Sequence, residues 1–351
     1  SLHDALPILS GARYIIGLEG VANKETLMLD VSLAEKLIEI DCSGNPNLTS
    51  IDLSNCVRLK RLDAHDCPRL GEGGNVPLNV GNCYNLKYLD ISNTSVPAIN
   101  TEKASYLTYV DIRKSKIAAL NYSNLQSLKD LKIESCDRLT SVSIDSCQGI
   151  TELTITKNPA LREIRLENCK NLKSLTVDNL SDLRNLTILD CPGLETLIVK
   201  RCELLTNLDV SGCTGLIKLE ATDSNLKDIQ FGTIANLKAI NISGSKLIST
   251  LDFGECNSTI ETLNIKDCFT LKNLLNINIL LKNYEHTNLF RGNDFLRRIT
   301  GTINFGDEIT SLREFFANCI DLEEVPNMNF NNVNILSGMF KNCFNLENVP
   351  V

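Results

Sequence analysis

Four cysteines recur at a constant spacing, which raises the possibility of metal or disulfide chemistry. They are Cys147, Cys169, Cys191 and Cys213, each 22 residues after the last. Zinc sites use closer pairs such as C-x-x-C, so this spacing argues against a metal. Cysteines on adjacent layers of a sheet would lie about 4.8 Å apart, which is within reach of a disulfide. Because Ala, Leu and Ile take the same position in other copies, we expect a structural ladder of mostly free thiols in the core.

The usual parts of an enzyme do not occur in the sequence. The chain has three histidines, His3, His65 and His286, and none of them lies in a metal-ligand motif. It has no glycine-rich phosphate loop and no nucleophile elbow. The sequence therefore predicts a protein that is not an enzyme and that uses no cofactor and no metal.

A row of carboxylates is the main candidate for binding chemistry. One acidic residue recurs at the same repeat position, at Asp41, Asp63, Asp90 and Asp111. Carboxylates stacked at strand spacing repel one another unless a cation or a basic partner lies over them. Tyrosine is favoured at interfaces because it is rigid and amphipathic, which makes Tyr88 and Tyr109 candidate anchors. The candidate ligand-binding residues are Tyr88, Tyr109, Asp63, Asp90, Asp111, Arg113 and His65, with Arg61 beside them.

A structural explanation competes with this binding patch. Aspartate also stands at the same repeat position in copies that have no neighbouring tyrosine, at Asp30, Asp52 and Asp209. Aspartate could therefore be a common solvated residue of this position, with no ligand.

The spacing of the cysteines and the row of aspartates both follow from one repeat. The sequence from residue 139 onward reads L-x-x-L-x-[I/V/L]-x-x-[C/N]-x-x-L, and a new copy starts about every 11 residues. Apolar residues at positions four and six, with polar residues between them, predict a short strand with one buried face. Eleven residues cannot hold a strand, a turn and a helix, so two unlike copies make one coil of about 22 residues. We expect a mainly β repeat solenoid whose coils carry a short parallel strand on each side, with little helix.

Composition agrees with a stack of thin layers. The 351 residues include no Trp, 5% aromatic and 43% hydrophobic residues, so aliphatic side chains must build the interior. The formal net charge is -8 and no run of Lys or Arg occurs, which argues against a nucleic-acid partner. No apolar run approaches the ~18 residues of a membrane helix, so we expect no membrane insertion in this chain.

The repeat pattern divides the chain into five segments. Residues 1–8, SLHDALPI, match the translated end of a common sequencing adapter and are interpreted as an artefact, which would make the chain a fragment. Residues 9–25 are expected to form a partial cap or an upstream repeat, and residues 26–271 a solenoid of about 11 coils. Residues 272–300 are expected to form an irregular junction, and residues 301–351 a second repeat type, cut within its second copy.

The second repeat type is richer in phenylalanine. Nine of the eleven Phe residues lie from Phe269 onward. Two copies match at an offset of 24 residues, through Phe316 and Phe340 and through Cys319 and Cys343.

Two stretches carry a family resemblance. The tandem LIEIDCSGNPNLTSIDLSNC resembles the alternating leucine-rich repeats of bacterial surface proteins. The stretch MFKNCFNLENVP resembles the BspA-like repeat of secreted or surface-anchored bacterial proteins. The resemblance covers roughly residues 26 to 351 and implies a leucine-rich repeat fold. It also implies an extracellular or cell-surface adhesion module that binds a protein or glycan ligand.

Two other functions stay open. One is an intracellular leucine-rich repeat scaffold or receptor for protein-protein interaction, although such proteins typically use longer coils that contain helices. The other is the repeat stalk of a larger enzyme.

Overall fold

A computed structural model describes most of the chain. The described residues are 14–16, 27–73, 77–282, 289–347 and 349. They form strands, turns and bends, and no helix occurs among them. Accordingly, this part of the chain holds no helix able to span a membrane. The interpreted adapter at 1–8 and most of the predicted cap at 9–25 lie outside the described residues, as does His286.

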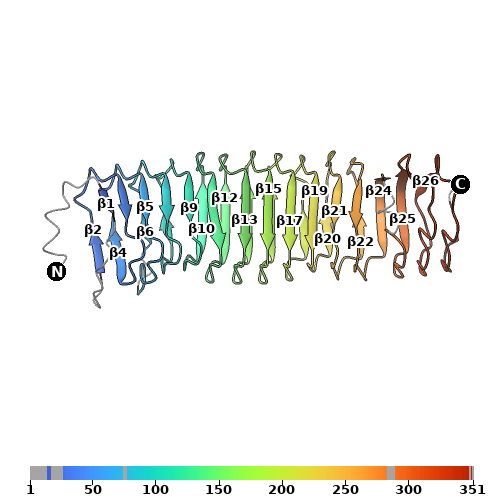
Figure 1. The fold of residues 1–351 in the computed structure, drawn as a ribbon, viewed down its shortest axis with the longest axis horizontal. Helices are drawn as coiled ribbons and strands as arrows, with labels where there is room; N and C mark the ends of the chain where they lie inside the picture. Colours follow the sequence, from blue (N-terminus) through green and yellow to red (C-terminus); the bar gives the residue numbers. More distant parts are fainter. Residues whose placement is uncertain (1–13, 17–26, 74–76, 283–288, 348, 350–351) are drawn as a thin grey trace. The chain divides into compact units, whose positions relative to one another are not determined.

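The chain divides into two compact units. The first unit is Ser1–Leu172 with Asn179–Leu183, and the second is Lys173–Asp178 with Arg184–Val351. Every strand pair described in either unit is parallel, and within each unit the strands follow one another in chain order (Figure 1).

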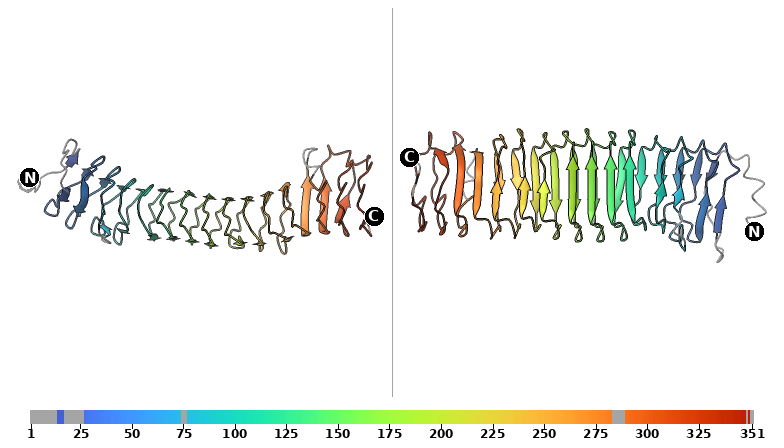
Figure 2. Two further views of the ribbon diagram at one scale, coloured as in Figure 1. Left: turned by 90° about the horizontal axis from the view of Figure 1, so that it is seen from below. Right: turned by 180° about the vertical axis from the view of Figure 1, so that it is seen from behind.

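The first unit has two sets of strands. The odd-numbered strands form one sheet, called here the front sheet, in the order β1 Tyr14–Ile16, β3 Glu39–Asp41, β5 Arg61–Asp63, β7 Tyr88–Asp90, β9 Tyr109–Asp111, β11 Asp130–Glu134 and β13 Glu152–Thr156. The even-numbered strands form the back of the coils: β2 Leu27–Asp30 with β4 Leu48–Asp52, β6 Leu78–Asn79 with β8 Ile99–Asn100, and β10 Ala119–Ser123, β12 Ser141–Asp145 and β14 Glu163–Glu167. The two sets lie on opposite sides of each coil (Figure 2).

The second unit repeats this plan. Its front strands are β15 Ser174–Asp178, β17 Thr196–Lys200, β19 Lys218–Thr222, β21 Ala239–Asn241 and β23 Thr262–Asn264. Its back strands are β16 Asn185–Leu189, β18 Asn207–Asp209 paired with β20 Asp228–Gln230, and then β22 Thr250–Asp252, β24 Asn273–Leu281, β25 Arg298–Phe305 and β26 Asn327–Asn329.

Strand β14 shows why the repeat folds in this way. Its side chains alternate between exposed and buried, and Ile164 and Leu166 are both 0% exposed. Ile164 lies in register with Val142 of the preceding coil, so aliphatic side chains stack upon their equivalents. This alternation is the period-two pattern of the sequence. The predicted fold, a mainly β solenoid with coils of about 22 residues and a strand on each side, is confirmed.

The turns depend on a backbone conformation that the repeat pattern did not reveal. The residue before the Cys or Asn position repeatedly adopts a positive φ, for example 54° at Ser146 and 53° at Asn168. Asparagine, aspartate and glycine tolerate this left-handed conformation best. At Gly44, with a φ of 68°, glycine fills the same position.

Most of the cysteines lie in the core of the coils. None of the fourteen cysteines forms a disulfide in the structure, and thirteen of them are buried. Burial raises the pKa of Cys147 to about 11 and the pKa of Cys213 to about 12. At the alternate turn position a polar side chain bonds the turn backbone instead, as where Asn45 donates to the carbonyl of Cys42 at 2.9 Å.

The C-terminal repeat packs aromatic rings across its 24-residue offset. Phe316 stacks on Phe340 with ring centroids 5.5 Å apart. Before it, β24 and β25 pair in parallel across the residues where the sequence places a junction. The segment boundaries at 271 and 300 stay predictions.

The left-handed turn predicts the effect of replacing Gly44. A Cβ atom added there would meet no atom within 4 Å, so only backbone strain opposes a side chain. Gly44→Ala should lower stability by about 1 kcal/mol, because a left-handed L-residue costs about 1–2 kcal/mol. Gly44→Asn should cost less. Denaturation midpoints of the two variants test this, and an Ala variant as stable as the Asn variant would contradict it.

Burial also predicts thiol reactivity. Because the thiolate form is suppressed in the core, most thiols should react slowly with a thiol reagent in the native protein. Cys343 is partly exposed and should react first, and Cys343→Ser should remove that phase. In denaturant without reductant, titration should count fourteen thiols. A lower count would show that disulfides form.

Candidate binding surface

The strand register gathers the predicted site residues into rows on the front sheet of the first unit. Tyr88 lies opposite Arg61 on one side and Tyr109 on the other. Two positions further along, Asp90 lies between Asp63 and Asp111. Residues up to 50 positions apart in the sequence therefore stand on three adjacent strands, β5, β7 and β9.

The first row is a column of stacked planar groups. The rings of Tyr88 and Tyr109 are stacked, with centroids 4.5 Å apart and an interplanar angle of 2°. The guanidinium carbon of Arg61 lies 3.6 Å from the centroid of the Tyr88 ring. Such aromatic pairs contribute about 0.5–1.5 kcal/mol beyond the area that they bury. We call Arg61, Tyr88 and Tyr109 the aromatic column.

Hydrogen bonds hold the tyrosines in place. The Tyr88 hydroxyl donates to Asp90 Oδ2 at 3.3 Å, and the Tyr109 hydroxyl donates to Asp111 Oδ2 at 3.2 Å. Burial raises the pKa of both phenols above the ordinary value, so both remain neutral donors. The column therefore presents half-buried rings in a fixed orientation.

The second row is buried, which corrects the interpretation of its aspartates as solvated residues. Asp63, Asp90 and Asp111 are 5%, 8% and 0% exposed. That interpretation holds elsewhere, because Asp30, Asp52 and Asp209 are exposed.

One hydrogen bond explains why aspartate recurs at this position. The backbone N–H of Ser92, two residues after the strand, donates to Asp90 Oδ1 at 2.9 Å. Exposed Asp52 accepts the same bond from Ser54 at 2.9 Å. The carboxylate thus closes the turn after the strand, as short polar side chains commonly do.

Each buried carboxylate also accepts hydrogen bonds of its own, and the partners of Asp63 and Asp111 include an arginine. Asp63 Oδ2 accepts a bond from Arg61 Nη2 at 2.6 Å, and its Oδ1 lies 2.6 Å from His65 Nδ1. Asp111 accepts two bonds from Arg113 Nε, at 3.0 and 2.9 Å. Asp90 takes a second bond from the Ser92 hydroxyl at 2.7 Å.

Three potential metal ligands come together in the same place. Atoms of Asp63, His65 and Asp90 lie within 4.8 Å of one another. The carboxylate oxygens of Asp63 and Asp90 already accept bonds from Arg61, His65 and Ser92. The guanidinium of Arg61 also neutralises the charge of Asp63. A cation would have to displace these partners.

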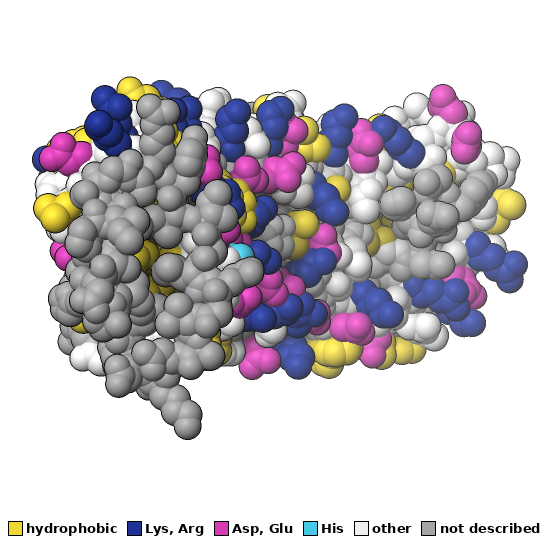
Figure 3. Space-filling model, turned by 60° about the vertical axis from the view of Figure 1, so that its left-hand side comes forward, with side chains coloured by type: hydrophobic (Ala, Val, Ile, Leu, Met, Phe, Trp, Pro, Cys, Tyr) yellow, Lys and Arg dark blue, Asp and Glu magenta, His cyan; other side chains and the backbone are white. Residues whose placement is uncertain are grey.

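Two shallow hollows adjoin Arg113. One, of about 440 Å³, lies over β11 and β13 and is lined by side chains that include Lys132 and Glu152. The other, of about 470 Å³, lies by the turns and is lined by residues that include Lys157. Figure 3 shows basic and acidic side chains intermixed over the surface that it displays. The aromatic column thus adjoins a polar, mixed-charge surface.

The stacking of Arg61 on Tyr88 was not predicted from the sequence, where Arg61 was expected only beside the candidate ligand-binding residues. Arg61 and Tyr88 are 27 residues apart, because extra residues follow Gly71 in the intervening coil. The two residues lie opposite each other only when the repeat copies are aligned across this insertion.

Comparison with known proteins gives a likeness of fold. No family model and no curated protein matches the chain. The functional domain of InlJ from Listeria monocytogenes, which includes a cysteine ladder, is 19% identical over 91% of this chain and 69% of that one, with a TM-score of 0.35. A leucine-rich repeat protein from Bacteroides ovatus is 15% identical over 95% and 85%, with a TM-score of 0.30. An internalin from Listeria monocytogenes is 13% identical over 87% and 81%, with a TM-score of 0.31. These neighbours are bacterial leucine-rich repeat proteins, and at such scores no function is transferred from them.

The contact between His65 and Asp63 predicts a pH dependence. The hydrogen bond to Asp63 raises the pKa of His65 above 6.5. The stabilisation from this pair should be complete below about pH 6.5 and should disappear as the pH rises through the pKa of the folded state. The stability difference between the wild type and His65→Gln should therefore shrink as the pH rises.

Two measurements check this prediction. The ring resonances of His65 in the full chain should titrate above 6.5, and Asp63→Asn should lower that pKa. Denaturation midpoints of the wild type and His65→Gln between about pH 5.5 and 8.5 give the stability difference. A difference that grows with pH would contradict the assignment.

Proposed function

We propose that this chain is a non-enzymatic binding module of a bacterial surface protein that holds a protein or glycan ligand on the front sheet of its first unit. The observation that carries the proposal is the aromatic column. Its rings are flat, half-buried and held by hydrogen bonds, so little conformational entropy is lost when a ligand packs on them. Tyrosine and arginine are also the residues that most often dominate binding interfaces.

The surroundings of the column fit either ligand class. Tyrosine faces pack against the apolar side of sugar rings as well as against peptide side chains. Arg113, His65 and the hollows beside Arg113 offer hydrogen-bond donors and charges of both signs. The buried carboxylates Asp63, Asp90 and Asp111 act beneath this surface by holding Arg61, His65, Arg113 and the tyrosine hydroxyls.

The extracellular assignment is part of the proposal. Its support is the resemblance of residues 26–351 to surface-protein repeats, in particular the BspA-like stretch near the C-terminal end of the chain. The second candidate is an intracellular scaffold for protein-protein interaction, for which the same column would serve. A third, the repeat stalk of a larger enzyme, would leave the column without a ligand.

A binding screen followed by paired substitutions tests the proposed surface. The chain would be screened against a glycan array and against collagen, fibronectin and laminin. For any ligand found, Tyr88→Ala and Tyr109→Ala should each weaken binding at least tenfold, because a buried aromatic anchor contributes about 2 kcal/mol or more. Titration calorimetry gives the affinities.

Tyr106→Ala is the matched control, because Tyr106 is 57% exposed and does not stack on Tyr88 or Tyr109. It should bind as the wild type does. Equal affinities for all three variants would remove the column as the site.

A further inference from the structure

Strand β23 is the last strand of the front sheet in the second unit. It pairs with β21 on one side, from Ala239 opposite Thr262 to Asn241 opposite Asn264. No strand among the described residues pairs with its other side. Strand β24 reaches this edge only at Ile260, which forms a parallel bridge with Ile279. Beyond that residue the edge has no strand partner among residues 289–347 or any other described part of the chain.

Comparison with β21 identifies the main-chain groups that are left open. In the coil of β21, the N–H of Ile242 donates to Asn264 at 2.9 Å and the N–H of Gly244 donates to Lys266 at 3.0 Å. The equivalent residues one coil later are Ile265 and Asp267. Their N–H groups have no hydrogen-bond acceptor among the described residues. An open row of this kind is a template for another strand.

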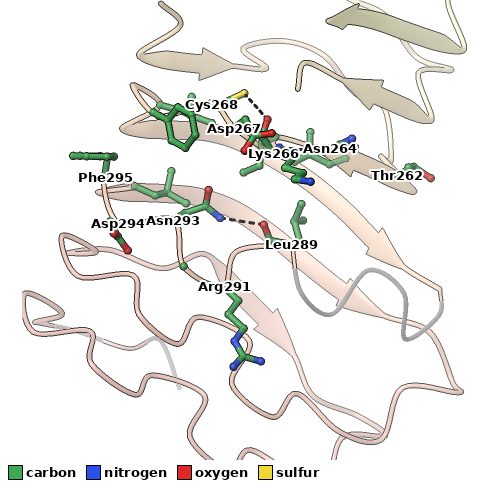
Figure 4. A pocket seen from close by; sticks show the side chains of 16 residues that line it. Thr262, Asn264, Lys266, Asp267, Cys268, Leu289, Arg291, Asn293, Asp294 and Phe295 are labelled. Carbon is green, nitrogen blue, oxygen red and sulfur yellow. Dashed lines mark hydrogen bonds between the residues drawn. The ribbon is translucent and has the colours of Figure 1, made fainter. Parts of the chain in front are cut away.

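A cavity of about 590 Å³ lies along this edge (Figure 4). One wall is β23 and the turn that follows it, and the other is the segment 289–296. Figure 4 shows Asn264 and Lys266 on one side, and Leu289 and Asn293 on the other. A volume of this size is typical of ligand pockets.

The second wall is anchored from behind. The Asn293 side chain donates to the carbonyls of Leu289 at 3.2 Å and Phe290 at 2.9 Å. Phe290 is 0% exposed and packs on Phe315 and Phe316, with ring centroids 5.4 and 5.1 Å away. The segment 289–296 is therefore held against the coil behind it by hydrogen bonds and packed rings.

The lining combines apolar and charged side chains. Phe269 on one wall and Phe295 on the other are 63% and 51% exposed. A ligand that covered these two rings would remove large apolar surfaces from water. Lys266 and Asp267 form no ion pair within the part of the chain that the structure describes. Charges of both signs are thus free to meet a ligand.

We propose that this cavity binds an extended peptide segment of a partner protein, which adds to β23 as a further parallel strand. The main chain of the peptide accepts hydrogen bonds from the N–H groups of Ile265 and Asp267. Alternate apolar side chains enter the cavity toward Phe269 and Phe295. Polar side chains of both signs face outward, near Lys266 and Asp267. This is strand addition at a sheet edge, in which main-chain bonds give affinity and alternate pockets give specificity.

Hydrogen exchange in the free 351-residue chain tests the open edge first. The amides of Ile265 and Asp267 should exchange at least tenfold faster than those of Ile242 and Gly244, their paired equivalents. Equal protection of the two pairs would mean that the edge is already covered, and would overturn the proposal.

A synthetic peptide tests the occupant. The probe is LIKLEATD, residues 216–223, capped at both ends and labelled with a fluorophore. It contains β19, a strand that pairs in parallel on both of its edges, and the whole peptide carries one basic and two acidic side chains. It should bind saturably, as measured by fluorescence anisotropy, and should slow exchange at Ile265 and Asp267. The absence of saturable binding would contradict the proposal.

Methylation of single peptide amides distinguishes strand addition from nonspecific apolar binding. In the protein, Glu220 of β19 directs its N–H toward β17, and Leu219 directs its N–H toward β21. A methyl group on the amide of Glu220 should weaken binding about tenfold, and one on the amide of Leu219 should have little effect. Equal effects of the two peptides would overturn the parallel register.

Substitutions locate the bound peptide. Phe269→Ala and Phe295→Ala should each weaken binding about tenfold. Phe344→Ala is the control, because Phe344 is 76% exposed and does not line the cavity. Binding that responds to Phe344→Ala, or to none of the three substitutions, would place the peptide elsewhere and refute the assignment.

Discussion

The main-chain hydrogen bonds between successive coils are the interaction on which the rest of the structure depends. Each coil carries short strands that cannot satisfy their own backbone groups, so its N–H and C=O groups pair with the coils before and after it. In the first unit, Cys42 donates to Asp63 of the next coil, and Arg61 donates to Ile38 of the preceding one. The same pairing stacks aliphatic side chains on their equivalents, which a single coil could not bury alone.

This pairing turns a repeat position into a row on the surface. Arg61, Tyr88 and Tyr109 form one column because the backbone register of three strands places them side by side. Where the strand pairing ends, it leaves main-chain groups without a partner in the described part of the chain. At β23 the register has no further strand to engage among the described residues, and main-chain groups whose equivalents are paired in the preceding coil face a cavity. The pairing of main-chain groups between coils thus explains both the aromatic column and the unpaired edge of β23.

The buried aspartates show how structure and binding share residues. A carboxylate on the last residue of the strand closes the turn through the N–H two residues later, whether it is exposed as Asp52 is or buried as Asp111 is. Where tyrosine or arginine neighbours it, the remaining oxygen also orients that side chain. The structural and functional explanations of this row are therefore compatible, because one carboxylate serves both the turn and the surface above it.

The sequence by itself determined the coil. Three sequence patterns predict which side chains face inward: the period-two alternation, the spacing of about 22 residues and the apolar character of the cysteine position. These patterns depend only on local geometry. The left-handed turns were not predicted from the sequence, because residues as different as Ser146 and Asn168 occupy them. Tertiary structure alone decided the stacking of Arg61 on Tyr88 across an insertion, the burial of Asp63, Asp90 and Asp111, and the open edge of β23. Each of these depends on which coil lies beside which, and on what a neighbouring coil covers or leaves exposed.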